Sequence, residues 1–437
     1  MNSEWKVLPL EDCMAAIIDY RGKTPTKTTF GVPLVTAKIV KGGRIEPAEE
    51  FIAESDFEPW MRRGMPEKGD VVMTTEAPLG EVAQLDGRKI ALAQRVITLR
   101  GKPSLLNNGY LRYLLQSTPV QDELKARATG TTVLGIKQSE LRKVSLALPS
   151  IPEQKSIAHI LGTLDDKIEL NRRMNATLEA MARALFQSWF VDFDPVRRNA
   201  VGGESRPEDA LFPDSFEDSA VGDIPRGWEV YPLSEKIQLL SGGTPKTSEP
   251  TYWDGDIPWY SVRDAPCETD VWVIQTDKTV TVQGIANSAA KILPGKTTII
   301  SARGTVGKLA LTGVPMAMNQ SCYGIRGIAG YGDYFTYYLV REATVRLQQN
   351  AHGSVFDTIT TRTFEGLDCV FPNKELTIKF DNAVEPLLSK IRSNLHQSRT
   401  LATVRDTLLP KLLSGELSSA GVDLAGLPDR SNLSNPQ

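Results

Sequence analysis

Residues 149–193 carry the pattern that most narrows how this chain of 437 residues can fold. Apolar and amide side chains recur there at alternating steps of four and three residues, which is the spacing of a coiled-coil seam. Pro149 and Pro152 end the preceding segment, because a residue before proline disfavours helical angles. Some forty residues predict a helix roughly 60 Å long, and its single apolar stripe requires a partner helix. The seam positions are Ile157, Leu161, Leu164, Ile168, Asn171, Asn175, Leu178, Ala182, Leu185 and Trp189.

The partner helix is predicted in the same chain, because the sequence aligns with itself when Leu164 is placed on Leu387. Segments upstream of the helix match at the same shift, with local slippage. The chain is therefore predicted to be a tandem duplication of a globular domain followed by a long helix. Asn171 and Asn175 would lie in the seam, where buried amides cost stability but can fix the register. The predicted spacer residues are Leu164, Ile168, Leu178 and Leu185 in the first helix and Leu387, Ile391, Leu401 and Leu408 in the second.

Each copy is predicted to have an α+β fold, a curved and mainly antiparallel sheet with helices late in the domain. Packed antiparallel, the two long helices would relate the copies by an approximate two-fold axis. Strands bounded by turn signals are predicted at residues 5–10, 31–40, 70–76, 81–86, 91–100 and 144–149, and again at 228–233, 256–262, 297–302, 308–313, 322–327 and 367–372, with helices at 110–125 and 334–348. The predicted boundaries are 1–150 and 227–372 for the two domains, 151–194 and 373–416 for the two spacer helices, 195–226 for a partly extended linker and 417–437 for a poorly ordered tail.

Cysteine usage and hydropathy favour a reduced, cytoplasmic protein. The four cysteines are far apart and form no CxxC pair. We expect no signal peptide and no membrane span, because no apolar run approaches the roughly 20 residues that a span needs. The formal net charge of −3 means that a DNA-binding role would need local basic loops, or a partner that neutralises the remaining phosphates.

Motifs for catalysis or metal binding are missing from the sequence. It contains no HExxH, no clustered Cys and His, no EF-hand loop and no GxSxG elbow. The stretch PGKTT (294–298) resembles the end of a phosphate-binding loop, but Ala290 stands where that loop needs glycine, so a turn into a strand is the better interpretation. No tetrad typical of a base-amino methyltransferase occurs. We therefore expect a binding or scaffold protein without a metal or cofactor of its own.

Polar and basic loops recur at equivalent places in the two copies, for example TTEAPLG (74–80) opposite SARGTVG (301–307) and ALAQR (91–95) opposite AMNQS (317–321). Hydroxyls, amides and single cations position a sugar-phosphate backbone and read base edges. Ordinary solvated loops are the alternative interpretation for any single residue. The predicted DNA-binding residues are Lys23, Thr24, Lys27, Lys38, Arg44, Thr75, Gln94, Arg95 and Thr131 in the first copy, and Lys246, Tyr260, Arg263, Arg303, Gln320, Ser321, His352 and Ser354 in the second.

Three segments resemble the specificity (S) subunit of type I restriction-modification systems: residues 148–196, 211–230 and 408–417. The most specific of them is SIPEQ before a helix that ends in FQSWFVDF, while the second copy departs from it with PNKELTIKF. The resemblance implies two target recognition domains, each reading one half of a bipartite, asymmetric site in double-stranded DNA. The helices between them would fix the gap and dock two methylation (M) subunits.

On the same resemblance, the partner subunits would hold every cofactor. The methylation subunits would carry S-adenosylmethionine and usually methylate adenine, and restriction (R) subunits would add ATP- and Mg-dependent translocation and cleavage. The chain itself would be non-catalytic. Two alternatives stay open at this point: a fused nuclease or methyltransferase with an unrecognised active site, and a protein-interaction scaffold with degenerate domains. Incubation of the chain alone with DNA and labelled S-adenosylmethionine tests the first alternative, and salt-dependent DNA binding tests the second.

Overall fold

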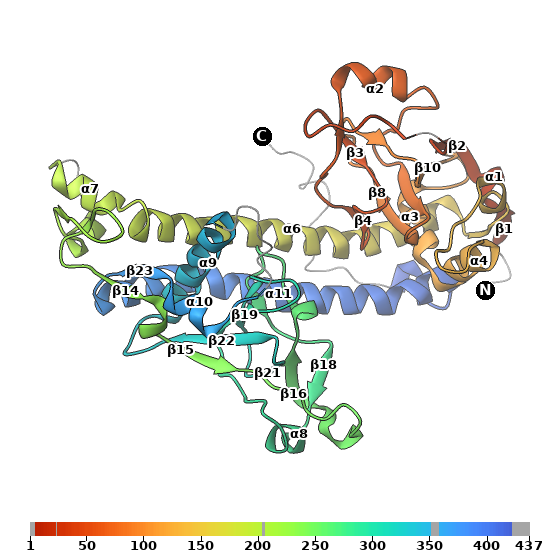
Figure 1. The fold of residues 1–437 in the computed structure, drawn as a ribbon. Helices are drawn as coiled ribbons and strands as arrows, with labels where there is room; N and C mark the ends of the chain where they lie inside the picture. Colours follow the sequence, from red (N-terminus) through yellow and green to blue (C-terminus); the bar gives the residue numbers. More distant parts are fainter. Residues whose placement is uncertain (1–4, 23, 203–205, 351–357, 422–437) are drawn as a thin grey trace. The chain divides into compact units, whose positions relative to one another are not determined.

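The computed structural model describes residues 5–22, 24–202, 206–350 and 358–421, and the chain divides into two compact units (Figure 1). Unit 1 comprises residues 1–167 and 400–437, and unit 2 comprises residues 168–399. The two long helices predicted from the seam are present as α6 (Ile151–Phe190) and α11 (Lys374–Ser414). Each unit contains one copy of the repeat together with part of both helices.

The centre of unit 1 is an antiparallel four-stranded sheet in the order β2-β10-β7-β8. Its apolar face, with Val71 and Ile97, packs on Tyr110 of α3, Ile157 of α6 and Leu412 of α11. A smaller sheet, β6-β3-β9, pairs β3 with β9 in parallel. The elements of unit 1 besides α6 and α11 are β1 (Lys6–Pro9), α1 (Leu10–Cys13), β2 (Met14–Asp19), β3 (Val32–Val35), β4 (Val40–Lys41), β5 (Arg44–Ile45), β6 (Phe51–Ile52), α2 (Glu54–Trp60), β7 (Val71–Thr75), β8 (Leu79–Gln84), β9 (Ala91–Leu92), β10 (Val96–Gly101), α3 (Asn108–Gln116), α4 (Thr118–Arg127), α5 (Gln138–Leu141) and β11 (Ser145–Leu148).

Unit 2 is built around a five-stranded sheet in the order β15-β22-β19-β20-β17, parallel only where β17 meets β20. Its core is aromatic: Phe190 of α6 packs on Phe335 of α9 and Phe380 of α11, with ring centroids 5.0 and 5.3 Å away. The further elements of unit 2 are α7 (Asp194–Ala200), β12 (Phe216–Glu217), β13 (Ile224–Pro225), β14 (Glu229–Pro232), β15 (Ile237–Ser241), β16 (Trp253–Tyr260), β17 (Trp272–Val273), β18 (Lys278–Val280), α8 (Val282–Ala286), β19 (Thr298–Ser301), β20 (Leu309–Thr312), β21 (Ala317–Met318), β22 (Cys322–Gly327), α9 (Asp333–Asn350), α10 (Thr361–Glu365) and β23 (Asp368–Phe371).

The duplication is visible in strand register as well as in element order. In unit 1, β1 pairs with β11 so that Lys6 faces Leu148. In unit 2, β14 pairs with β23 so that Glu229 faces Phe371, and these two residues are the repeat equivalents of the first pair. In each unit this two-stranded ribbon leads directly into a long helix. The repeat predicted from the seam therefore extends to individual backbone pairs.

Several local predictions differ from the structure. The single strands predicted at 31–40 and 91–100 are each interrupted, and form β3 and β4, and β9 and β10. The strands β2 and β15, which flank the central sheets, were absent from the predicted set. In the first copy no glycine or proline separates the one-turn helix α1 from β2, so the sequence gives no punctuation there. The single helix predicted at 110–125 is two helices, α3 and α4, because Ser117 between them is extended and Pro119 starts the second.

The segment predicted as a partly extended linker, 195–226, is packed against unit 2 instead. It forms α7, a 3₁₀ turn at Pro207–Leu211 and the β12–β13 pair. Phe212 and Ile224 are buried in the unit 2 core. The fully buried Asp209 accepts hydrogen bonds from both Nη2 and Nε of Arg198, at 2.6 and 2.9 Å. These charge-assisted bonds from Arg198 lower the pKa of the Asp209 carboxyl.

Candidate nucleic-acid interface

One end of the unit 1 sheet carries a polar groove of about 500 Å³. The sheet is antiparallel, so the ends of β2 and β7 and the start of β10 lie at the same edge. Three predicted DNA-binding residues line the groove together: Thr75 at the end of β7, and Gln94 and Arg95 just before β10. Four polar or charged lining residues were not singled out from the sequence: Arg21, Glu76, Thr129 and Lys137. The first three adjoin or lie in loops that the sequence marked.

Backbone hydrogen bonds hold the groove in shape. The amide of Thr75 donates to the carbonyl of Arg95 at 2.9 Å, and the carbonyl of Thr75 accepts from the amide of Ile136 at 3.0 Å. Thr129 and Gly135 exchange a pair of bonds at 2.8 and 2.9 Å, which closes the loop between them. Because these bonds are made by the main chain, side chains at the rim can vary without loss of the framework.

The groove has an excess of positive charge and one carboxylate at its rim. Arg95 lies 3.8 Å from Glu76, and the two side chains are 51% and 45% exposed. Arg21 contacts Asp19 at 3.4 Å. Its Nε and Nη2 atoms are buried and lack a hydrogen-bond partner among the residues that the structure describes. Buried guanidinium donors of this kind are costly unless a partner satisfies them.

Most other predicted residues of unit 1 lie outside this groove. Lys27 pairs with Glu50 at 2.8 Å, and Arg44 pairs with Glu46 at 2.7 Å, so both cations already have a carboxylate. Three further predicted residues, Thr24, Lys38 and Thr131, are exposed, and Thr131 lies on the loop whose neighbours line the groove. Lys23 lies outside the described residues.

Unit 2 repeats the same framework at the equivalent end of its sheet. The amide of Ala302 donates to the carbonyl of Ser321 at 2.8 Å, and its carbonyl accepts from the amide of Ile359 at 2.9 Å. The predicted residues Arg303 and Gln320 adjoin these bonds and are exposed. Thr244, on the loop after β15, donates its hydroxyl to the Gln320 amide oxygen. The structure therefore brings Arg303, Gln320 and Ser321 together.

The prediction for Tyr260 is wrong. This residue ends β16, where it pairs with Met318, and its side chain is fully buried in an apolar cluster. Burial raises the pKa of its hydroxyl. A tyrosine at a strand end looks exposed in sequence, but this one is buried in an apolar cluster that includes Leu293 and Met318.

The remaining predicted residues of unit 2 lie on its exposed loops or outside the described chain. Lys246 is exposed on a loop, and its backbone carbonyl accepts a hydrogen bond from Trp253 Nε1 at 3.2 Å. Arg263 is exposed in a 3₁₀ turn, Val262–Asp264, that Ser261 and Asp264 cap. His352 and Ser354 lie outside the described residues.

The predicted spacer residues line the inner faces of α6 and α11 to different extents. Leu164 and Ile391 are buried, at 3% and 0% exposure. The others are half-buried: Ile168, Leu178, Leu185, Leu387, Leu401 and Leu408. In unit 1 the two helices are also joined by Asp165, which accepts from Arg405 and from Arg112 of α3, each at 2.7 Å. The sequence pattern did not indicate this polar junction.

Buried amides form the centre of the helix contact in unit 2. Asn394 donates its Nδ2 to Asn175 Oδ1 at 2.9 Å, and Asn171 donates its Nδ2 to Ser398 Oγ at 3.1 Å. The two bonds are repeat equivalents, because the shift that places Asn171 on Asn394 also places Asn175 on Ser398. Contacts of this kind require the helices to run antiparallel. The asparagines predicted for the seam therefore do lie in it.

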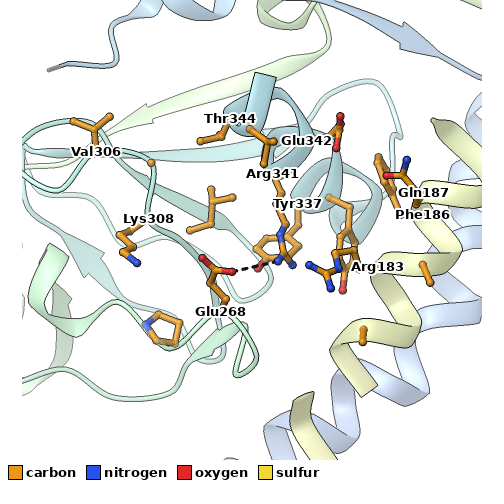
Figure 2. Close-up of a pocket in the computed structure, with 17 residues that line it drawn as sticks. Arg183, Phe186, Gln187, Glu268, Val306, Lys308, Tyr337, Arg341, Glu342 and Thr344 are labelled. Atoms are coloured by element: carbon orange, nitrogen blue, oxygen red, sulfur yellow. Dashed lines mark ion pairs between the residues drawn. The ribbon is translucent and has the colours of Figure 1, made fainter. Parts of the chain in front are cut away.

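Unit 2 also contains a cavity of about 600 Å³, which lies between α6, α9 and the β19–β20 hairpin (Figure 2). Arg341 of α9 points into it and pairs with the buried Glu179 of α6 and, at 3.7 Å, with Glu268. The Tyr338 hydroxyl is buried and has no hydrogen-bond partner among the described residues. None of the predicted DNA-binding residues lines this cavity.

Comparison with known proteins decides the family. Residues 2–180 and 225–376 match the family model described as the type I restriction modification DNA specificity domain. The chain belongs to that family. The two matched ranges fall one on each copy of the repeat, so the resemblance found in the helix segments is confirmed.

Relatives from two organisms carry the same description. The type I restriction enzyme HindI specificity subunit of Haemophilus influenzae is 29% identical over 355 residues, which cover 70% of this chain and 77% of the relative. The MjaIX specificity subunit of Methanocaldococcus jannaschii is 27% identical over 423 residues, covering 95% and 94%. The prediction of a DNA-specificity subunit rather than an enzyme is confirmed by this family membership.

The fold is shared with a solved member of the family. The crystal structure of a type I restriction-modification S subunit from M. genitalium aligns with a TM-score of 0.56 at 16% identity, over 94% of this chain and 96% of that one. The predicted α+β domains with long helices are thus confirmed. In the described ranges, no helix has both the length and the apolarity to cross a bilayer.

Proposed function

We propose that this chain recognises a bipartite, asymmetric DNA site, with one half-site bound by the end of each unit's sheet. The observation that carries the proposal is the repeated framework, in which Thr75 and Ala302 make the same two backbone hydrogen bonds in their own units. Because the chain belongs to a family of DNA specificity domains, we take DNA as the ligand of this framework. Because the side chains around it differ between the units, the two half-sites differ in sequence.

The side chains at each sheet end have the chemistry for base readout. Gln94 and Arg95 in unit 1, and Gln320 and Arg303 in unit 2, carry amide and guanidinium groups that can form paired hydrogen bonds to adenine or guanine in the major groove. The exposed Lys246 carries a flexible point charge suited to a phosphate, as does Lys38. Base contacts would set the sequence, and phosphate contacts would set the position on the duplex.

The near-neutral charge of the chain points to partners that complete the DNA clasp. At a net charge of −3, the chain can offer local basic loops, and partner subunits would neutralise the remaining phosphates. We propose two methylation subunits docked on the helices α6 and α11, and restriction subunits bound through them. S-adenosylmethionine would be held by the methylation subunits, and ATP and Mg by the restriction subunits, with adenine as the methylated base. The helix pair would set the distance between half-sites, and the complex would work in the cytoplasm.

The test uses the chain assembled with its methylation subunits. Methylation-sensitive sequencing of a genome exposed to this complex first defines the recognised site. Binding is then titrated with the cognate duplex and with every single-mismatch duplex. We expect Arg303→Ala to relax the preference at one position of the second half-site, by about 1–3 kcal/mol. Lys246→Ala is the matched control: it should weaken all duplexes alike and flatten the salt dependence.

Two results would reject the proposal. If the wild-type complex binds all duplexes equally, or does not bind DNA in a salt-dependent way, the units are not DNA readers and a scaffold role replaces the proposal. If the chain alone transfers a labelled methyl group from S-adenosylmethionine to DNA, it has an active site of its own. An unchanged preference in Arg303→Ala at every position means only that this residue is structural.

A further inference from the structure

The two sheet ends have the same backbone arrangement but different side-chain chemistry at two positions. Three contacts establish the equivalence. Glu76 forms an isolated β-bridge with Gly135, and Arg303 forms the equivalent β-bridge with Thr358. The residue before each one makes the two backbone hydrogen bonds that the units share. Those bonds also show that Arg95 and Ser321 hold equivalent positions in the two units. At these positions unit 1 therefore has a carboxylate and a guanidinium, while unit 2 has a guanidinium and a hydroxyl.

In unit 1, Glu76 and Arg95 do not satisfy each other's hydrogen-bonding groups. The distance of 3.8 Å between Arg95 Nε and Glu76 Oε2 is too long for a hydrogen bond. Both side chains are about half exposed, and exposed pairs of this kind contribute little to stability. No other hydrogen bond or ion pair is made by the Glu76 side chain among the described residues. A structural role therefore leaves the carboxylate unexplained.

A carboxylate at a DNA-facing edge has a specific consequence. It repels phosphates, so it weakens binding to every sequence unless a base offers it a hydrogen. In the major groove, cytosine N4 is the donor that Glu and Asp characteristically accept from, while arginine donates to O6 and N7 of guanine. Glu76 and Arg95 lie side by side, and so do cytosine and guanine within one base pair.

We propose that Glu76 is a specificity-determining residue of unit 1 and that, together with Arg95, it reads a single C·G base pair. Glu76 accepts from cytosine N4, and Arg95 donates to guanine O6 and N7 of the same pair. Guanine or thymine in the cytosine position would face the carboxylate with acceptors or a methyl group. Adenine there keeps an amino donor for Glu76, but its thymine partner lacks the two acceptors that Arg95 requires. This inference rests on the proposed function, and it assigns a named base pair to one half-site.

The experiment uses the assembled complex and its defined site. With Glu76→Gln, the preference for C·G at one position of the unit 1 half-site should fall by about 5- to 150-fold. Binding to mismatched duplexes should rise, because the repulsion of phosphates is removed. Glu58→Gln is the control, since Glu58 is an exposed carboxylate on α2 outside the groove. It should leave the preference at every position unchanged.

Modified duplexes separate direct readout from a structural role. N4-methylcytosine at the assigned position removes the donor in the major groove, and 7-deazaguanine opposite removes an acceptor. The wild-type complex should lose affinity for both duplexes. Glu76→Ala, which has no acceptor, should become insensitive to the first, and Arg95→Ala to the second. A wild-type preference that survives intact in Glu76→Gln, or a uniform loss at all positions, overturns the inference.

Failure of the proposed function looks different from failure of this inference. In the former case the wild-type complex shows no sequence preference at all. In the latter it is specific, but the variant keeps its C·G preference or the half-site contains no C·G pair. The double variant Glu76→Arg/Arg95→Ser adds a further check, because it installs the unit 2 pair on the unit 1 framework. It should replace the C·G preference at that position and leave the second half-site unchanged.

Discussion

The amide contact between the helices of unit 2 should be worth a measurable part of the free energy of unfolding. Asn394 is 1% exposed, and its Nδ2 donates to Asn175 Oδ1 at 2.9 Å. Asn394→Ala removes that donor and leaves a buried acceptor with none. Asn175, itself 2% exposed, keeps only its own bond to Asp270 at 3.0 Å. An unsatisfied buried polar group costs about 1–3 kcal/mol, so we expect a loss of about 2 kcal/mol.

The assay is urea unfolding followed by tryptophan fluorescence. Trp272 is a local reporter, because it is 2% exposed and donates its Nε1 to the carbonyl of Leu388 on α11 at 2.8 Å. Ser393→Ala provides the control: Ser393 is exposed on the same helix, and its change should stay within about 0.5 kcal/mol.

A double variant tests the reason for the cost. Asn175→Leu/Asn394→Leu replaces both partners by apolar groups, which is nearly neutral or stabilising when shape is kept. Asn175→Leu also removes the bond to Asp270, so the double variant should cost less than the sum of the two single leucine variants. The reasoning is refuted if Asn394→Ala costs less than about 0.5 kcal/mol. It is refuted as well if the two leucines cost the sum of their single effects, since no coupling would then exist.

Two further predictions follow from the helices and their packing. Four residues inserted after both Lys167 and Arg399, at the boundaries between the units, lengthen each helix by about 6 Å. The recognised gap should then grow by one or two base pairs, and an unchanged gap in a folded, active complex would contradict the ruler role. Burial raises the pKa of Asp381 to about 6, although the amides of Tyr334 and Phe335 donate to its carboxylate. The folded state therefore holds this proton more tightly than the unfolded state, so the Asp381 contribution to stability falls as pH rises from about 4 to about 6. Asp381→Asn should remove that part of the slope in unfolding measured against pH, and an identical slope would contradict the assignment.

Sequence alone predicted the long-range organisation better than the local details. The alternating spacing in residues 149–193 predicted α6, because a coiled-coil seam requires the same side-chain positions over many turns. The alignment of the chain with itself, with Leu164 on Leu387, predicted α11. The repeat then placed β1 and β11 opposite β14 and β23. In contrast, the packing of 195–226 depends on Phe212 and Ile224 finding the unit 2 core, a tertiary contact that a composition rich in Gly, Pro and acidic residues conceals.

The candidate site divides along the same line. Thr75, Gln94 and Arg95 could be marked from sequence, because turn signals place them at strand ends, where antiparallel order brings such ends together. Tyr260 could not be excluded, since its burial depends on a two-residue strand, β21, paired in parallel from far along the chain. Glu76 lies in the marked loop TTEAPLG (74–80) but is not among the predicted DNA-binding residues. Its approach to Arg95, at 3.8 Å, depends on the pairing of β7 with β10, which the sequence does not show.

The repeat explains why specificity can vary in this fold without cost to stability. At each sheet end, main-chain bonds to Thr75 or Ala302 hold the loops, so the framework does not depend on the side chains of Glu76, Arg95 or Arg303. The pair at Glu76 and Arg95 is about half exposed, and a change there alters neither core volume nor buried hydrogen bonds. The helix contact is constrained in the opposite way. Its amides are buried, and the loss of one amide leaves its partner without a hydrogen bond. A change of helix register therefore costs stability, while a change of the rim side chains does not. Under the proposed function, a duplicated chain with these two properties could have its half-sites diverge independently while α6 and α11 keep their separation.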